Sequence, residues 1–352
     1  MKILILPKYG PKGASSRYRF YNYEPYFTEQ NVHLEFRPLL PDEYIVDLYN
    51  KRKIKTFFRQ ISSIVKRFLF LFLLKKREYH ALVIEKELFP NIPYFIEAFL
   101  LKGKTYFLDF DDYVGFSYKT DKLKKLILSD KLNKLVANSA LTTVGNRWYF
   151  SEFRKGHLAY LPTVIDINDY CIQKKNKETN TIVWVGSPYT AKYLKLIEPV
   201  LINLIKEIPF TLKIIGGDIE LDKSIPVIRV NWSEVSENEE IASCDIGIMP
   251  LEDTLWEKGK CGFKLIQYMA SGLPVIGSSL PANEEIIING ETGFIARTEN
   301  EWFDFLKSLL LNPKEAYLMG KKGRKRVEEH YSYQLWGDKY VSLIKQTIKQ
   351  LK

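Results

Sequence analysis

Cysteine is scarce in this sequence, which has only three among 352 residues: Cys171, Cys244 and Cys261. They are scattered and odd in number, and they lack the close pairs from which a zinc site or a disulfide framework is built. This scarcity argues against a disulfide-stabilised secreted protein, and we predict a reducing, cytoplasmic setting.

Long apolar runs are also missing. The longest, residues 68–74, falls far below the ~20 residues that a membrane-spanning helix needs. The first ten residues, MKILILPKYG, hold too short an apolar run for a signal peptide and continue into turn residues. The sequence therefore predicts no transmembrane segment, and its start predicts a buried strand.

Several catalytic signatures are absent as well. The four histidines lack a neighbouring metal ligand or nucleophile; they are His33, His80, His157 and His330. The glycine-containing loops match neither the dinucleotide fingerprint nor the Gly-Lys-Ser/Thr ending of a Walker loop. No recognisable nucleic-acid-binding module is present. Metal catalysis, hydride transfer, ATP hydrolysis and nucleic-acid binding are all disfavoured.

The composition is that of a globular protein with a basic charge. Hydrophobic residues make up 46% and charged residues 27% of the chain. The 52 Lys and Arg exceed the 42 Asp and Glu by 10, which favours an anionic partner such as a phosphate-bearing ligand or an acidic membrane surface. A length of 352 residues favours two domains.

Short β-rich runs alternate with segments of helical period, a pattern typical of a parallel sheet covered by helices. In the first half, strands are predicted at 3–6, 82–84 and 106–108, and helices from about residue 16, at 94–101 and at 122–135. After the polar stretch 173–180 the pattern restarts, with a helix at 193–206 and strands at 181–185, 211–215, 227–230, 246–248 and 274–276.

We therefore predict an α/β fold of two Rossmann-like doubly wound domains, residues 1–172 and 173–334. The amphipathic segment 335–352 could pack back on the first domain. Because such sheets bind ligands beyond the carboxyl ends of their strands, we expect the two domains to face each other across a cleft lined by strand-to-helix loops.

The most informative loop, residues 256–264, opens a helical stretch. Gly259 and Gly262 allow close approach of backbone to a ligand, and the helix start offers free N–H groups to a pyrophosphate. Lys260 and Lys264 add positive charge, while Gln267 could hydrogen-bond a sugar hydroxyl. An ordinary solvated helix start is the alternative.

Two further loops could meet a phosphorylated donor. Residues 185–192 combine Gly186 and Ser187 at a strand end with Lys192 near a helix start. In the first domain, residues 9–19 include Gly13, Ser16 and Arg17, which we expect to face the cleft. A plain strand-to-helix turn is the alternative for the loop 185–192.

Carboxylates follow two strands. Asp109, Asp111 and Asp112 stand at the end of the strand 106–108, where one of them could contact a sugar or act as a base. Glu284 and Glu285 could hold donor hydroxyls, or they could simply be favourable charges at a helix start. A solvated acidic loop is the alternative for the first group. Residues 85–90, which end another strand, could contact the acceptor or form a salt-bridged turn.

Residues 51–77 are basic and rich in aromatic and aliphatic side chains. Such a segment could lie on an anionic membrane at the inner face of the plasma membrane and approach a lipid-linked acceptor. A core-packing helix with a solvated basic face explains the same pattern.

The order of motifs resembles the large retaining glycosyltransferase family four, of the GT-B fold. In the second half the resemblance rests on the segments 245–251, 259–276, 283–286 and 289–294. In the first half, the segments 14–20, 109–112 and 144–146 look like a branch that builds bacterial surface polysaccharides such as capsule, O-antigen or exopolysaccharide.

The chain departs from the pattern of this family at three positions. Gly259 and Gln267 stand where the family has a pair of glutamates, so the first carboxylate is either lost or moved to Glu257. A glutamine can still hydrogen-bond a ribose. Asp111 stands where the family frequently has a histidine.

The resemblance implies sugar transfer with retention, without a metal or other cofactor, from a nucleotide-sugar donor to a glycan or lipid-linked acceptor. The predicted catalytic residues are Asp111, Lys192 and Lys264, and no metal ligand is predicted. The predicted donor-binding residues are Gly13, Ser16, Arg17, Asn146, Gly186, Ser187, Lys260, Cys261, Gly262, Phe263, Gln267 and Glu285. A nucleotide-sugar epimerase of the same fold and a non-catalytic nucleotide-sugar binder stay open as alternatives.

Overall fold

The computed structural model describes residues 1–49, 52–75, 78–172 and 180–351. The chain forms two compact units: a first domain of Met1–Thr163 with Trp336–Lys352, and a second domain of Val164–Leu335. Residues 164–172 belong to the second domain because Arg324 donates hydrogen bonds to the carbonyls of Ile167 and Tyr170. The predicted boundary at residue 172 lies beside the predicted linker, which is outside the described residues except for Asn180.

The first domain is built on a six-stranded parallel sheet with the strand order β2-β1-β3-β4-β5-β6. Four strands, β1, β3, β4 and β5, are buried along almost their whole length, as expected where helices cover both faces of a parallel sheet. The strands are β1 (Lys2–Leu6), β2 (His33–Phe36), β3 (Ala81–Glu85), β4 (Tyr106–Phe110), β5 (Leu141–Val144) and β6 (Leu158–Tyr160).

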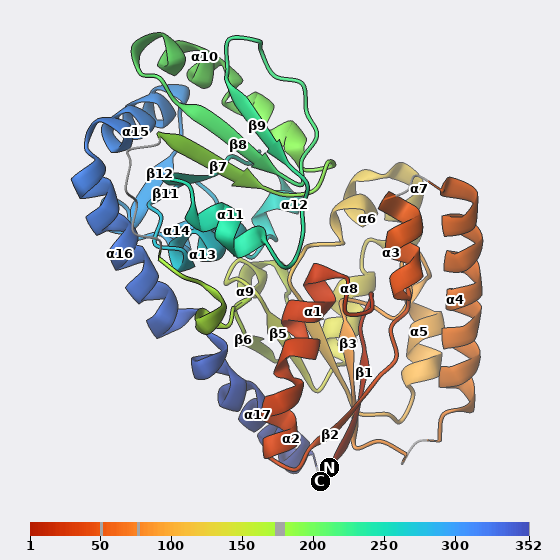
Figure 1. The fold of residues 1–352 in the computed structure, drawn as a ribbon. Helices are drawn as coiled ribbons and strands as arrows, with labels where there is room; N and C mark the ends of the chain where they lie inside the picture. The colour runs from red at the N-terminus through yellow and green to blue at the C-terminus, as the bar shows by residue number, and fades with distance from the viewer. Residues whose placement is uncertain (50–51, 76–77, 173–179, 352) are drawn as a thin grey trace. The chain divides into compact units, whose positions relative to one another are not determined.

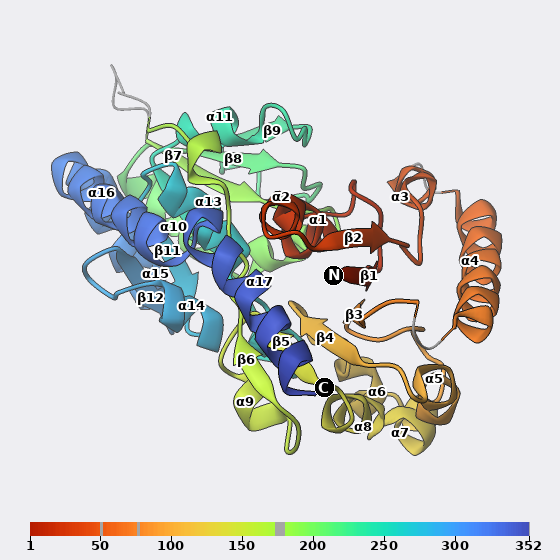
Figure 2. The same ribbon diagram turned by 90° about the horizontal axis from the view of Figure 1, so that it is seen from below.

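Helices of the first domain fill the connections between these strands (Figure 1). They are α1 (Ala14–Arg19), α2 (Glu24–Glu29), α3 (Asp42–Tyr49), α4 (Lys53–Leu73), α5 (Tyr94–Leu101), α6 (Phe116–Thr120), α7 (Lys122–Leu128), α8 (Lys131–Ala137) and α9 (Tyr149–Glu152). The long helix α4 lies on the outside of the domain next to α5 (Figure 2).

The C-terminal helix α17 (Tyr333–Gln350) completes the first domain (Figure 1). Its buried Tyr340 packs edge-on against Tyr23 and against Phe27 of α2, with ring centroids 5.0 and 5.5 Å apart. Gln30 donates a hydrogen bond to Asp338 at 2.8 Å.

The second domain repeats the design with the strand order β12-β11-β10-β7-β8-β9, again all parallel. Along β7, Ile182 and Trp184 enter one hydrophobic core and Val183 and Val185 the other, because successive side chains point to opposite faces of a sheet. The strands are β7 (Thr181–Val185), β8 (Thr211–Ile215), β9 (Val227–Val230), β10 (Ile246–Met249), β11 (Val275–Ser278) and β12 (Gly293–Ala296).

Helices cover both cores of the second domain. They are α10 (Glu198–Glu207), α11 (Glu237–Ala242), α12 (Leu255–Lys258), α13 (Phe263–Ala270), α14 (Pro281–Ile286), α15 (Glu299–Leu311) and α16 (Pro313–His330). The predicted α/β fold of two doubly wound domains is confirmed.

Candidate functional site

In the second domain, two glycine-containing backbone segments meet at the carboxyl ends of neighbouring strands. Gly186 directly follows β7, and a Cβ atom there would lie 2.5 Å from the Trp184 ring and 2.8 Å from Lys264 Nζ. Gly216 follows β8 with φ of 75°, and a Cβ there would lie 2.7 Å from the Gly186 carbonyl oxygen. Glycine is therefore required on both neighbouring strands, and it leaves backbone open at the strand ends.

Lys264 lies in the first turn of α13, with its Nζ 4.3 Å from the centroid of the Trp184 ring. Burial lowers the pKa of Lys264 to about 7, and the charge of Lys260 lowers it in the same direction. No carboxylate forms an ion pair with Lys264 within the described part of the chain. A cation held in this way is stabilised by an anion that binds beside it.

Two more of the predicted lysines gather at the ring of Tyr193. Lys192 Nζ lies 5.1 Å and Lys260 Nζ 6.0 Å from the centroid of that ring. The hydroxyl of Tyr193 donates to the buried carboxylate of Glu257, which also accepts a hydrogen bond from Thr254. Glu257 thus fixes the ring under the lysines, and the structure brings Lys192, Lys260 and Lys264 into one region.

Gln267 faces away from solvent in the same helix. Its Nε2 donates to the Tyr170 hydroxyl at 3.3 Å and to Glu237 Oε2 at 3.2 Å. Glu237 is itself buried and accepts a hydrogen bond from Trp232 Nε1 at 2.9 Å. Sequence reasoning missed Glu237, which carries no local motif and reaches Gln267 only through the packing of α11 on α13.

The remaining predicted donor residues of the second domain surround the start of α13. Gly262 is the N-cap residue of this helix, in the left-handed region with φ of 64°, and it lies between the buried Cys261 and the half-buried Phe263. Glu285 is half-buried in α14, the helix whose Asn283 and Ile286 lie against Gly262. Ser187 lies beside Gly186, and its hydroxyl is 3.3 Å from that of Thr190.

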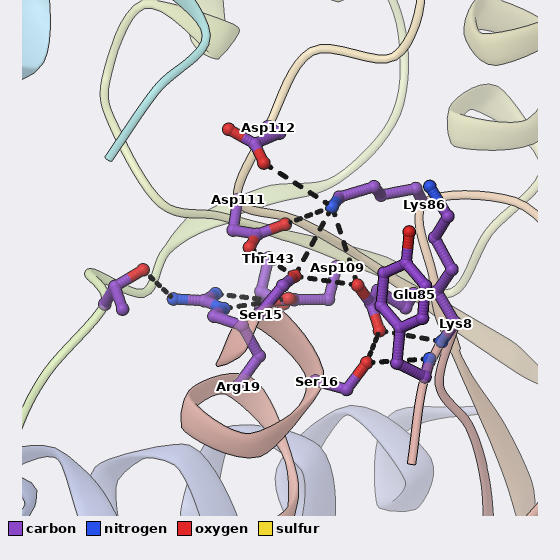
Figure 3. A network of polar contacts seen from close by, with 12 residues as sticks. Lys8, Ser15, Ser16, Arg19, Glu85, Lys86, Asp109, Asp111, Asp112 and Thr143 are labelled. Carbon is purple, nitrogen blue, oxygen red and sulfur yellow. Dashed lines mark hydrogen bonds and ion pairs between the residues drawn. The ribbon is translucent and has the colours of Figure 1, made fainter. Parts of the chain in front are cut away.

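In the first domain, Asp111 is part of a charged network at the ends of β3 and β4 (Figure 3). Lys86 Nζ lies 2.6 Å from Asp111 Oδ1, and the Ser15 hydroxyl lies within hydrogen-bond distance of Asp111 Oδ2, at 2.5 Å, and of Glu85 Oε1, at 2.8 Å. Although burial alone would raise the pKa of Asp111, Lys86 and then Ser15 hold it at about 2. Asp111 is therefore ionised at neutral pH, which makes it a hydrogen-bond acceptor and a weak base.

Asp109 has a different role from Asp111, although it is only two residues away. It forms a two-point ion pair with Arg19, at 2.8 and 2.5 Å, and accepts a hydrogen bond from Thr143. Arg19 also donates to the carbonyl of Leu161 at 2.7 Å. Arg19, Asp109 and Thr143 are all buried, so their hydrogen bonds connect α1, β4 and β5 within the core.

Four other residues of the first domain are predicted to bind the donor. Ser16 joins this network through Glu85, and the other three are Arg17, Asn146 and Gly13. Ser16 is buried, donates to Glu85 Oε2 at 2.5 Å and accepts from the Tyr9 amide at 3.0 Å. Arg17 is buried with its guanidinium 5.1 Å from the ring of Tyr18, and Asn146 accepts from the Trp148 amide at 2.8 Å. Gly13 is required where it stands, because a Cβ there would overlap the side chain of Tyr9. Donor binding by these four residues stays a prediction.

Comparison with known proteins finds a family match over part of the chain and a similar fold over nearly all of it. Residues 179–312 match the family model described as Glycosyl transferases group 1. Over 134 residues the chain is 28% identical to trehalose synthase of Pyrococcus horikoshii, a match that covers 38% of this chain and 31% of that relative. The chain thus spans about a third of the length of this curated relative.

Solved structures are similar over both domains at low identity. Sucrose-phosphate synthase of Thermosynechococcus elongatus has a TM-score of 0.67 at 12% identity, covering 99% of this chain and 100% of the other. HepE of Anabaena, solved in complex with UDP-glucose, has a TM-score of 0.66 at 11% identity, covering 99% and 100%. The chain therefore has the GT-B fold of these proteins, and residues 179–312 of its second domain match the group 1 glycosyl transferases.

Proposed function

We propose that the protein is a retaining glycosyltransferase that moves a sugar from a nucleotide-sugar donor to a glycan or lipid-linked acceptor. The observation that carries the proposal is Lys264, a largely desolvated cation that has no carboxylate partner in the described chain and lies beside the open backbone of Gly186. The family match covers this whole loop, and HepE, which has the same fold, was solved with UDP-glucose.

The second domain supplies the groups that a donor diphosphate needs. Lys264, Lys260 and Lys192 provide positive charge, and the start of α13 adds the positive end of its helix dipole. As the bond between sugar and phosphate breaks, negative charge develops on the diphosphate, and these groups stabilise it without a metal ion. This assignment makes Lys264 and Lys192 catalytic residues.

For Asp111 we propose a contact with a sugar hydroxyl. Its carboxylate is ionised and held in place by Lys86 and Ser15, so it can accept a hydrogen bond without taking up a proton. Retention at the transferred sugar and a place in bacterial surface polysaccharide synthesis rest on the resemblance of the sequence motifs.

The test is calorimetric titration of a panel of nucleotide sugars into the wild-type protein between pH 6 and 9. The diphosphate of these donors keeps its charge over this range, whereas free Lys264 loses its proton as the pH rises through about 7. Since the anion binds the protonated form, affinity should fall with increasing pH. Lys264→Ala should bind the donor about 10- to 100-fold more weakly, and its affinity should not fall with increasing pH.

The matched control is Lys321→Ala, which removes an exposed lysine of α16. It should keep both the affinity and the pH slope of the wild type. Unchanged donor binding by Lys264→Ala would contradict the proposed site. Consumption of donor that needs no acceptor would favour the epimerase, and binding without turnover on any glycan or lipid acceptor would favour the non-catalytic binder.

A further inference from the structure

The outward side of α4 is an uncovered apolar surface. Large hydrophobic side chains recur along it at helical spacing, and Phe58 and Leu69 are 66% and 52% exposed. We call this set the apolar face of α4: Ile54, Phe57, Phe58, Ile61, Val65, Leu69, Phe72 and Leu73. The opposite side of the helix already packs on the domain through Arg67 and Leu71, so the exposed set has no part in that core.

The surface extends beyond α4. The ring of Phe72 stacks on that of Phe99 from α5 at 6.3 Å, and Phe95 of α5 is exposed as well. The short helix α7 exposes Leu126 by 85% together with Leu123. In both views α4, α5 and α7 lie on the outer side of the first domain (Figures 1 and 2). Exposed apolar side chains gathered on neighbouring helices such as α4 and α5 mark an interaction site, unlike single exposed side chains.

The helices α4 and α7 carry basic residues and no acidic one. The sequence of α4 contains five basic residues and no acidic one. Arg59 pairs with Asp47 and Arg67 is buried, which leaves Lys53, Lys55 and Lys66 at the surface. The sequence of α7, KLKKLIL, likewise has three lysines and no acid. Two copies of this face would repel each other, whereas an anionic surface attracts it.

We propose that the apolar face of α4, together with the exposed side chains of α5 and α7, binds the surface of an anionic lipid bilayer. The apolar side chains enter the boundary between headgroups and acyl chains, and the lysines at the border reach the lipid phosphates. None of the helices in the described chain is long and apolar enough to span a membrane, so the contact is interfacial. This inference does not depend on the donor chemistry of the second domain.

Vesicle co-sedimentation of the full chain tests the proposal. The wild type should bind phosphatidylcholine vesicles that contain phosphatidylglycerol, and pure phosphatidylcholine vesicles much more weakly. The double variant Phe58→Glu/Leu69→Glu should bind at least about tenfold more weakly. It removes apolar side chains that would be buried in the bilayer, and it adds negative charges that the anionic lipids repel. The matched control Tyr317→Glu/Leu318→Glu changes two similarly exposed side chains of α16 and should bind as the wild type does.

Circular dichroism melting should show both double variants folded. Equal vesicle binding by the α4 variant and the wild type would overturn the proposal, as would equal binding of the wild type to vesicles with and without phosphatidylglycerol. Self-association would replace the proposal if light scattering shows a wild-type dimer that the α4 variant lacks, and if neither protein binds vesicles.

Discussion

Gln267 shows at the scale of a residue why this chain departs from the family pattern. Its amide nitrogen lies 3.2 Å from Glu237 Oε2 and 3.3 Å from the Tyr170 hydroxyl, and both Gln267 and Glu237 are buried. A glutamate in its place would set a second buried carboxylate against the first, with the donated hydrogen bond lost. The amide at position 267 is therefore matched to the acid on α11.

Restoring the family residue should for this reason harm the protein. We expect Gln267→Glu to lower the free energy of unfolding at pH 7 by about 2 kcal/mol, through like-charge repulsion and the lost hydrogen bond. Because the repulsion raises the folded-state pKa of the new pair, the loss should shrink as the pH falls and one carboxyl takes up a proton. Urea denaturation across the pH range measures both effects.

The double variant Gln267→Glu/Glu237→Gln is the control, because it exchanges the two groups. It should recover most of the lost stability. If it is no more stable than Gln267→Glu alone, the contact between positions 267 and 237 is not the cause.

At the scale of elements, the position of α13 depends on how closely α16 approaches the turn that follows α13. A Cβ at Gly320 of α16 would overlap the carbonyl oxygen of Gly272 and lie 2.8 Å from its carbonyl carbon. Gly272 is itself fixed in the left-handed region with φ of 75°. At Gly323, one turn later, the nearest atom is Met269 Cγ at 3.3 Å, part of a flexible side chain.

These two glycines make a matched pair of substitutions. Gly320→Ala should destabilise the protein by about 2 to 3 kcal/mol, because backbone cannot move aside as a side chain can. Gly323→Ala should change stability by no more than about 1 kcal/mol, since the gain in helix propensity offsets a small shift of Met269. Chemical denaturation of both variants measures the difference. Equal losses would show that the approach of α16 to Gly272 is not restricted by backbone.

Local sequence predicted these elements where the pattern was strong. The strand at 181–185 and the helix at 94–101 are found as predicted. The predicted helix 122–135 is instead two helices, α7 and α8, separated at residues 129–130. The predicted helix 193–206 is wrong at its start, where a 3-10 helix, Ala191–Leu196, precedes α10 and its N-terminal Pro199. Strands β2, β5, β6 and β12 are only three or four residues long and were missed.

At the scale of the whole molecule, the parts of the site that could be predicted are those carried by single loops. Gly186, Lys260 and Lys264 stand in short glycine and lysine motifs from which a phosphate site is predicted, and donor binding by them stays a prediction. The pair of Arg19 and Asp109 joins residues 90 apart in sequence, and Lys86 takes its place against Asp111 only after β3 and β4 align. Such partners follow from topology, so no local pattern shows them.

The clearest case of long-range dependence is α17, which completes the first domain from the far end of the sequence. Tyr340 is buried and packs against the rings of Tyr23 and Phe27. Truncating a buried aromatic side chain to alanine costs about 3 to 5 kcal/mol. We therefore expect Tyr340→Ala to lower the thermal stability of the first domain strongly. Tyr317→Ala, at an exposed tyrosine of α16, should leave it nearly unchanged.

Scanning calorimetry with and without a nucleotide sugar separates the two domains in this experiment. The donor should raise the transition of the second domain, because it binds only the folded state. In Tyr340→Ala the other transition should fall while the donor affinity measured below both transitions stays that of the wild type, since Lys264, Lys260 and Lys192 all lie in the second domain. A variant that loses donor affinity while its first domain keeps its stability would contradict this assignment of α17, because Tyr340 would then act on the donor site instead of the first-domain core.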